Sequence, residues 1–171
     1  MVGDARRDDT TTDHNEHVTS AHDCPSSPTS PPAGEGLRAT LGGVDNSVAL
    51  VTGANKGIGK EIARQLADAG LAVYVGSRDA TRGERAVAEI GNGARLAVLD
   101  VTAAASAAAA VRQVDALDIL VNNAGISGDG KTPDQDDPAA FRHIYETNVF
   151  GVVTVTNAFL PVLRRSAHPR Y

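Results

Sequence analysis

The stretch TGANKGIG, residues 52–59, constrains the fold more than any other part of the sequence. It follows a short apolar run at residues 48–51 and precedes residues 58–67, where apolar side chains recur every four positions. The run predicts a strand buried on both faces, and the recurrence predicts an amphipathic helix closed by Gly70. A glycine-rich turn between such a strand and helix is typical of phosphate binding, because the helix presents free N–H groups and the positive end of its dipole.

The same alternation continues along the chain. Short apolar runs predict three more strands, and helical spacing or helix-forming composition predicts three more helices. The strands are expected at residues 71–75, 96–99 and 117–121, and the helices at 82–90, 103–114 and 141–165, with a stop or bend near Pro161. This β-α-β-α-β-α-β-α order predicts the α/β class, with a Rossmann-like, doubly wound parallel sheet.

Residues 1–46 differ from the rest of the chain in composition. They hold eight acidic and three basic residues and account for the whole net charge of −5, whereas residues 47–171 hold thirteen of each. Few large apolar side chains occur there, so we expect a disordered polar tail, followed by one domain over residues 47–171. His14, His17, His22 and Cys24 could ligate a metal, but a flexible tail offers no preformed geometry, and no metal site is expected.

Composition also limits the classes of partner and compartment. No basic face is evident, which argues against a nucleic-acid partner. Cys24 is the only cysteine, which excludes an intramolecular disulfide. No apolar run reaches the length of a membrane span, so no membrane partner and a cytoplasmic location are expected.

Two cations suggest which dinucleotide the fold would select. An acidic residue at the end of the second strand would accept hydrogen bonds from the ribose hydroxyls of NAD. Here Ser77-Arg78-Asp79 follows that strand, and Arg78 offers a planar cation suited to phosphate. Lys56 in the glycine turn adds a second charge, so NADP(H) is favoured and NAD(H) stays an alternative. Asp79 is an acidic residue close to the same place and so complicates this preference, although it could instead cap the next helix.

Polar residues follow the third and fourth strands. Asp100, next to Val101, could reach an adenine ring, could cap the alanine-rich helix, or could do both. Asn122 and Asn123 could tie neighbouring strands together through their amides, while Ala124 and Gly125 leave room for a ribose.

The motifs TGANKGIG, LDV, NNAG and TNVFG occur in this order on successive strand–helix units, and from about residue 47 to residue 170 the chain resembles the short-chain dehydrogenases/reductases. GANKGIG together with SRDATRGERAV is most similar to the carbonyl reductase branch, which prefers NADPH. The resemblance implies hydride transfer between a nicotinamide and a small carbonyl substrate. The implied cofactor-binding residues are Gly53, Asn55, Lys56, Gly57, Ile58, Gly59, Ser77, Arg78, Asp100, Val101, Asn122, Ala124 and Gly125.

The family's catalytic group comprises an Asn, a Ser, and a Tyr followed four residues later by Lys. Asn148 matches the first, but no Tyr-x-x-x-Lys occurs in the sequence. We therefore expect a chain truncated before the catalytic Ser and Tyr, holding strands 3-2-1-4 of the family's order and inactive by itself. The fourth strand would be a bare apolar edge, through which, together with the long last helix, the chain could self-associate. The alternative is a non-catalytic nucleotide-binding or interaction module that pairs with an intact relative.

Overall fold

The computed structural model describes residues 47–128 and 137–171 of the chain. The predicted tail, with its three histidines and Cys24, lies outside the described residues. Its disorder, and the expectation that it holds no metal site, therefore stay predictions.

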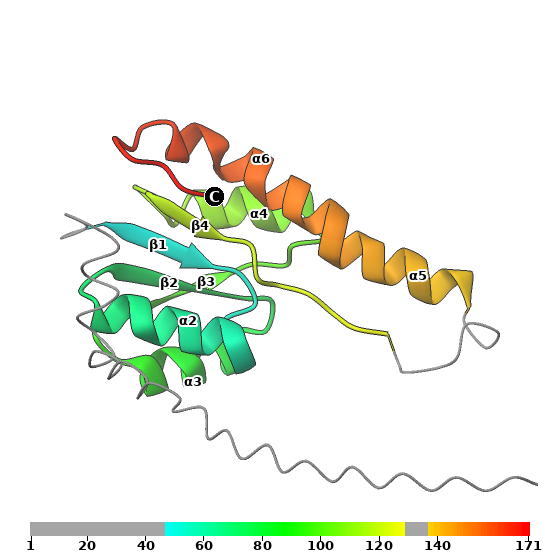
Figure 1. The fold of residues 1–171 in the computed structure, drawn as a ribbon, viewed down its shortest axis with the longest axis horizontal. Helices are drawn as coiled ribbons and strands as arrows, with labels where there is room; N and C mark the ends of the chain where they lie inside the picture. The colour runs from blue at the N-terminus through cyan, green and yellow to red at the C-terminus, as the bar shows by residue number, and fades with distance from the viewer. Residues whose placement is uncertain (1–46, 129–136) are drawn as a thin grey trace, which may run out of the picture. The chain divides into compact units, whose positions relative to one another are not determined.

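Four parallel strands form one sheet in the order β3-β2-β1-β4 (Figure 1). This confirms the predicted fold class and strand order. The strands are β1 (Val48–Val51), β2 (Ala72–Ser77), β3 (Arg95–Val98) and β4 (Ile119–Val121). The helices are α2 (Gly57–Asp68), α3 (Ala80–Ile90), α4 (Ala104–Val111), α5 (Pro138–Tyr145) and α6 (Gly151–Leu163), with a π-helical turn η1 (Glu146–Phe150) between the last two.

The register aligns the ends of β1 and β4 and places them close to the end of β2 at Ser77. Val51 of β1 lies opposite Val75 of β2 and Val121 of β4. Because the strands are parallel, the loops that follow them leave the sheet at the same edge. The predicted glycine turn and the NNAG segment therefore meet there.

Helices cover both faces of the sheet, as Figure 1 shows. Helices α2 and α3 pack on the face to which Val51 points, and α4 and α6 pack on the face to which Leu50 points. The alanine-rich α4 contributes Ala107 and Ala110, both fully buried against α6. Small side chains on α4 allow α6 to place Phe159, also fully buried, in the same layer.

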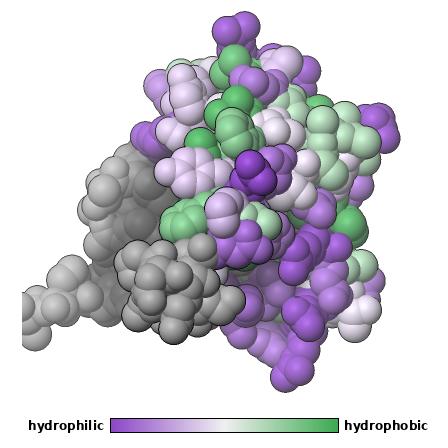
Figure 2. Space-filling view, turned by 90° about the vertical axis from the view of Figure 1, so that its right-hand side faces the viewer, coloured by the Kyte–Doolittle hydropathy of each residue, from purple (hydrophilic) through white to green (hydrophobic). Residues whose placement is uncertain are grey.

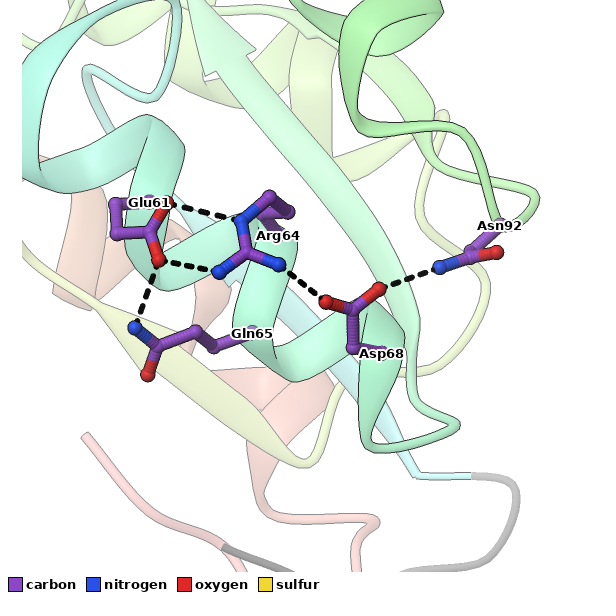
Figure 3. Close-up of polar contacts among 5 residues, drawn as sticks. All are labelled: Glu61, Arg64, Gln65, Asp68 and Asn92. Carbon is purple, nitrogen blue, oxygen red and sulfur yellow. Dashed lines mark hydrogen bonds and ion pairs between the residues drawn. The ribbon is translucent and has the colours of Figure 1, made fainter. Parts of the chain in front are cut away.

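A polar network ties α2 to the turn that follows α3 (Figure 3). Arg64 donates to Glu61 and to Asp68, Gln65 donates to Glu61, and Asn92 donates to the other oxygen of Asp68. The Arg64 and Gln65 hydrogen bonds lower the pKa of Glu61 to about 2. These side chains are largely solvent-exposed, so their ion pairs add little to stability.

Two predicted elements were too long. The alanine-rich helix ends at Val111 rather than Val114, and the fourth strand begins at Ile119 rather than Leu117. Val114 and Leu117 are nevertheless almost completely buried. Apolar residues in irregular segments can also lie in the core. The apolar side chains of Val114 and Leu117 therefore made the predicted helix and strand longer than the observed ones.

The predicted long helix is continuous but not uniform. It begins at Pro138, where the Asp137 carboxylate caps it, and it passes through η1 into α6. The predicted stop near Pro161 agrees with the structure, because α6 ends at Leu163, two residues beyond the proline, and the core buries Leu163 completely. No helix within the described residues is both long enough and apolar enough to cross a bilayer.

The edge of β4 is not bare, contrary to the prediction. Arg170 forms a parallel bridge with Ile119, accepts a hydrogen bond from Leu120 N–H (2.9 Å) and donates to the Asp118 carbonyl (2.8 Å). The Asp118 carboxylate accepts from Val48 N–H (2.8 Å) and from the Ser166 hydroxyl (2.6 Å). Asp118 thus joins the start of β1 to the segment that protects the β4 edge.

We predict that Asp118→Ala lowers the free energy of unfolding by about 2–3 kcal/mol, because hydrogen bonds to a charged acceptor contribute about 1.5–3 kcal/mol each and Asp118 is only half-buried. Urea denaturation measures this. The control is Asp115→Ala, an exposed carboxylate whose hydrogen bond to Arg165 uses the main-chain carbonyl. Equal losses in the two variants would contradict the role given to Asp118.

Candidate functional site

A cavity of about 490 Å³ opens where the loops leave the carboxyl ends of the strands. Ligands of open α/β sheets bind at this edge, and the volume is in the range of small-molecule sites. Eleven of the residues predicted for the cofactor line it: Gly53, Asn55, Lys56, Gly57, Ile58, Gly59, Arg78, Asp100, Val101, Ala124 and Gly125.

The glycine turn has the conformation that its sequence predicts. Gly53 and Gly57 have φ of 65° and 57°, values that favour glycine. A Cβ on Gly53 would lie 2.8 Å from Cα of Ala124, so this position also needs the space. A Cβ on Gly59 would collide with the Asn123 amide, whereas one on Gly57 would meet nothing within 4 Å. Gly57 therefore leaves the backbone accessible from the cavity.

The first turn of α2 is left free for an anion. Lys56 is the N-cap residue, and within the described residues no side chain caps this helix. The N-terminal N–H groups therefore face the cavity without a side-chain acceptor, at the positive end of the helix dipole. Ile58, which lies beside these groups and lines the cavity, is 77% exposed. A bound ligand would cover this apolar side chain.

The Thr52 side chain joins the glycine turn to the end of β4. It is 1% exposed, and its hydroxyl donates to the Val121 carbonyl and accepts from the N–H groups of Asn123 (2.9 Å) and Ala124 (3.0 Å). Asn123 donates to the Thr52 carbonyl (2.8 Å), as the prediction of strand-tying amides requires. The role of Thr52 could not be predicted from its neighbours in the sequence, because its hydrogen-bond partners lie about seventy residues away.

Three cationic residues line the cavity. Lys56 and Arg78 line it as predicted, and Arg82 joins them from the first turn of α3. Asp79 caps α3 by accepting from Arg82 N–H (2.9 Å), which confirms its predicted role, and its other carboxylate oxygen lies 3.5 Å from Arg82 Nε. Figure 2 shows hydrophilic residues crowded over the lower part of this face, toward α2 and α3.

Ser77 does not line the cavity. It is buried, its hydroxyl donates to the Asp79 carbonyl (2.7 Å), and it accepts from Asp79 N–H (3.3 Å). Ser77 thus holds the bend that presents Arg78. We assign it a supporting role at the site.

Asp100 and Val101 form another wall of the cavity. The hydroxyl (2.8 Å) and the N–H (3.0 Å) of Thr102 donate to Asp100 and lower the pKa of its carboxyl, and the charge of Arg78 acts in the same direction. Asp100 is therefore ionised at neutral pH. It does not cap α4, whose N-cap residue is Ala103, so the capping role predicted for Asp100 was wrong. The Asp100 side chain instead closes its own turn.

Asn122 points away from the cavity. Its amide donates to the Thr156 hydroxyl of α6 (3.2 Å), and Asn122 does not line the cavity. The neighbouring Asn123 does line it. Sequence alone could not distinguish two adjacent asparagines, because successive side chains leave a strand on opposite faces.

Asn148 lies in the π-helical turn and binds the loop that follows β4. Its amide donates to the Ile126 carbonyl (2.8 Å), and its amide oxygen accepts from Ile126 N–H (2.9 Å). Ile126 and Thr147 line the cavity, although Asn148 does not. The loop that begins after β4 is thus joined to the long helix at Ile126 by the Asn148 side chain.

Several lining residues were not predicted: Asp79, Arg82, Leu99, Thr102, Asn123, Ile126 and Thr147. Arg82 carried a usable signal, since it lies one helical turn beyond Arg78 at the start of a predicted helix. Leu99 and Thr147 are placed by tertiary packing, for which the sequence has no local signal.

Comparison with known proteins gives this geometry a context. The family model for short chain dehydrogenases matches residues 47–169. Short-chain dehydrogenase/reductase 1 of Saponaria officinalis is 40% identical over 153 residues, which cover 71% of this chain and 50% of that protein.

Two solved structures of relatives hold a dinucleotide or an analogue. The 3-ketoacyl-(acyl-carrier-protein) reductase from Brucella melitensis, complexed with NADH, has a TM-score of 0.67 and 34% identity, covering 71% of this chain and 52% of its own. Alcohol dehydrogenase from the archaeon Thermococcus sibiricus, complexed with 5-hydroxy-NADP, has a TM-score of 0.67 and 33% identity, covering 74% and 57%.

The match is partial in length but consistent in kind. The chain spans about half the length of the curated relatives it matches, namely 54%, 50% and 51% of three of them. Family model, sequence relatives and solved structures all indicate the same group of oxidoreductases. The chain therefore belongs to the short-chain dehydrogenase family.

Proposed function

We propose that the cavity binds NADP(H), and that the full-length form reduces a small carbonyl substrate by hydride transfer from this cofactor. The observation that carries the proposal is that three cationic residues, Lys56, Arg78 and Arg82, line a cavity built on a glycine turn. Membership of an oxidoreductase family supports the reaction type.

The residues divide into parts that suit the parts of a dinucleotide. The free first turn of α2 suits the pyrophosphate, and Asp100 with Val101 suits the adenine ring. Ala124 and Gly125 leave room beside their backbone for a ribose. The bound cofactor would supply the hydride, while these residues would hold and orient it.

The choice of NADP(H) over NAD(H) rests on charge. The relatives of known structure carry NADH in one case and an NADP analogue in the other, so they leave the choice open. Arg78 and Arg82 present guanidinium groups, which pair well with a phosphate, and Lys56 adds a point charge. Asp79, the nearby carboxylate, is engaged in capping α3.

Turnover is a separate matter from binding. Asn148 is the one member of the family's catalytic group that these 171 residues hold. Without a Tyr hydroxyl to donate a proton, and a Lys to lower the pKa of that Tyr, the carbonyl oxygen has no acid in position. We propose that the chain by itself binds the cofactor without using it.

A second candidate function is that of a non-catalytic nucleotide-binding or interaction module. This candidate is favoured because the residues proposed to bind the cofactor form a cavity, whereas Asn148 is the only residue that matches the family's catalytic group. The long helix offers an apolar surface for self-association, hereafter the outer stripe, formed by Phe141, Tyr145, Val149, Phe150 and Val153, each 45–55% exposed. This stripe is a better candidate than the β4 edge, part of which Arg170 occupies.

For cofactor choice, Arg78→Gln should weaken NADPH binding about tenfold to a hundredfold, because a charge-assisted hydrogen bond contributes about 1.5–3 kcal/mol. NADH lacks the phosphate, so its affinity should change much less. Isothermal titration calorimetry measures both. Arg85→Gln is the matched control, since Arg85 pairs with Glu89 on α3 and does not line the cavity. Equal weakening of both cofactors by Arg78→Gln would refute the phosphate assignment.

For turnover, the purified chain with NADPH and a panel of aldehydes and ketones should show no NADPH oxidation above the blank, because it has no Tyr-x-x-x-Lys pair. Absorbance at the reduced nicotinamide band follows the reaction, and an intact relative serves as the positive control. A reproducible rate from this chain would disprove the proposal of inactivity. NADPH binding without a rate would support it.

For self-association, Val153→Lys should weaken the proposed association through the outer stripe about tenfold or more, because it places an unpaired charge in an apolar contact. Sedimentation velocity over a concentration series measures this. Ala88→Lys on the exposed side of α3 is the matched control and should not change the assembly. A wild-type chain that stays monomeric at every concentration would contradict association through the outer stripe.

A further inference from the structure

Gly151 occupies a position whose backbone does not require glycine. It has φ −60° and ψ −41°, which is ordinary helical backbone, and it is buried at the first residue of α6. Glycine is the poorest helix former after proline, so its presence inside a long helix needs another reason. The reason is space rather than conformation.

The space next to Gly151 is taken by Val101. A Cβ on Gly151 would lie 2.9 Å from Cγ2 of Val101, 3.3 Å from its Cβ and 3.3 Å from the Glu146 carbonyl oxygen. Val101 belongs to the turn after β3 and lines the cavity. The long helix therefore touches the cavity wall at this point, through a contact that only glycine permits.

The turn that carries Val101 cannot easily move away. Asp100 accepts from Thr102, its N–H donates to the Ser106 hydroxyl (2.9 Å), and its carbonyl accepts from Ala103 N–H (3.2 Å). Valine is also stiff, because its branched Cβ restricts its rotamers. A side chain at position 151 would thus displace Val101 within the cavity wall or push the helix outward.

The helix is held on its own side as well. One turn before Gly151, Asn148 is joined by two hydrogen bonds to Ile126, and Thr147 lines the cavity. Moving the helix outward would therefore also move the loop after β4. Both ways of relieving the contact would change the cavity.

We infer that Gly151 is a positioning residue for the nucleotide site: by its lack of a side chain it sets the distance between the long helix and Val101, and so the width of the adenine side of the cavity. The inference rests on the proposed function, since it assigns to NADP(H) the ligand that this width serves. Gly151 does not line the cavity and acts through Val101.

The test is a double-mutant cycle read by NADPH affinity. Gly151→Ala should weaken NADPH binding about tenfold, because overpacking of a fixed contact displaces side chains. Val101→Ala removes the methyl groups that the new Cβ would strike. The variant with both substitutions should therefore bind NADPH about as tightly as Val101→Ala alone. Calorimetry of the full 171-residue chain provides the four affinities.

A control separates positioning from general loss of stability. Val155 lies one turn further along α6, is fully buried in the core, and does not line the cavity. Val155→Ala should lower the melting temperature and leave the NADPH affinity unchanged. If Gly151→Ala binds NADPH like the wild type, or if Val101→Ala fails to rescue it, the inference is wrong. If the wild type binds no dinucleotide, the proposed function has failed instead, so the two failures are distinguishable.

Discussion

The geometry of the site depends on the hydrogen bonds of the Thr52 hydroxyl. This buried group accepts hydrogen bonds from two N–H groups of the NNAG segment and donates one to the carbonyl of the last residue of β4. The glycine turn and the NNAG segment are therefore joined where they leave the sheet. The close approach of Gly53 and Ala124 follows from it, since any side chain on Gly53 would force these loops apart. The Asn123 amide strengthens this junction, because it donates to the Thr52 carbonyl (2.8 Å).

The features that local sequence controls were predictable. Gly53 and Gly57 adopt left-handed backbone in a turn whose flanking sequences predict a strand and a helix. Asp79 caps the helix that follows it by accepting from the N–H three residues ahead. What the sequence did not show depends on partners far along the chain. Asn122 turns to Thr156, 34 residues away, and Asp118 reaches Ser166, 48 residues away. No periodicity or propensity encodes such pairs, which arise only when the elements pack.

The charges around the cavity are unequal, and this inequality has a consequence for orientation. Lys56, Arg78 and Arg82 line the cavity as cations, whereas Ala124 and Gly125 bring no charge. A dinucleotide with an extra phosphate on its adenosine half would gain most Coulomb energy when that phosphate lies beside these cations. Asp100 keeps its negative charge, because its two hydrogen bonds come from the neutral Thr102. With Asp79 it offsets two of the three cationic lining residues, so the formal charge of the lining remains positive. The charged side chains would then orient the ligand, while the glycine turn would leave space for it next to the backbone.

The long helix connects this site to the surface. On its inner side Thr147, Asn148 and Gly151 line the cavity or contact residues that do, and on its outer side lies the apolar outer stripe. A partner that bound the stripe and shifted the helix would press on Val101 through Gly151 and on Ile126 through Asn148. Because these two contacts lie on successive turns of one helix, they would respond together. The same rigidity that fixes the cavity would thus couple its width to whatever covers the outer face.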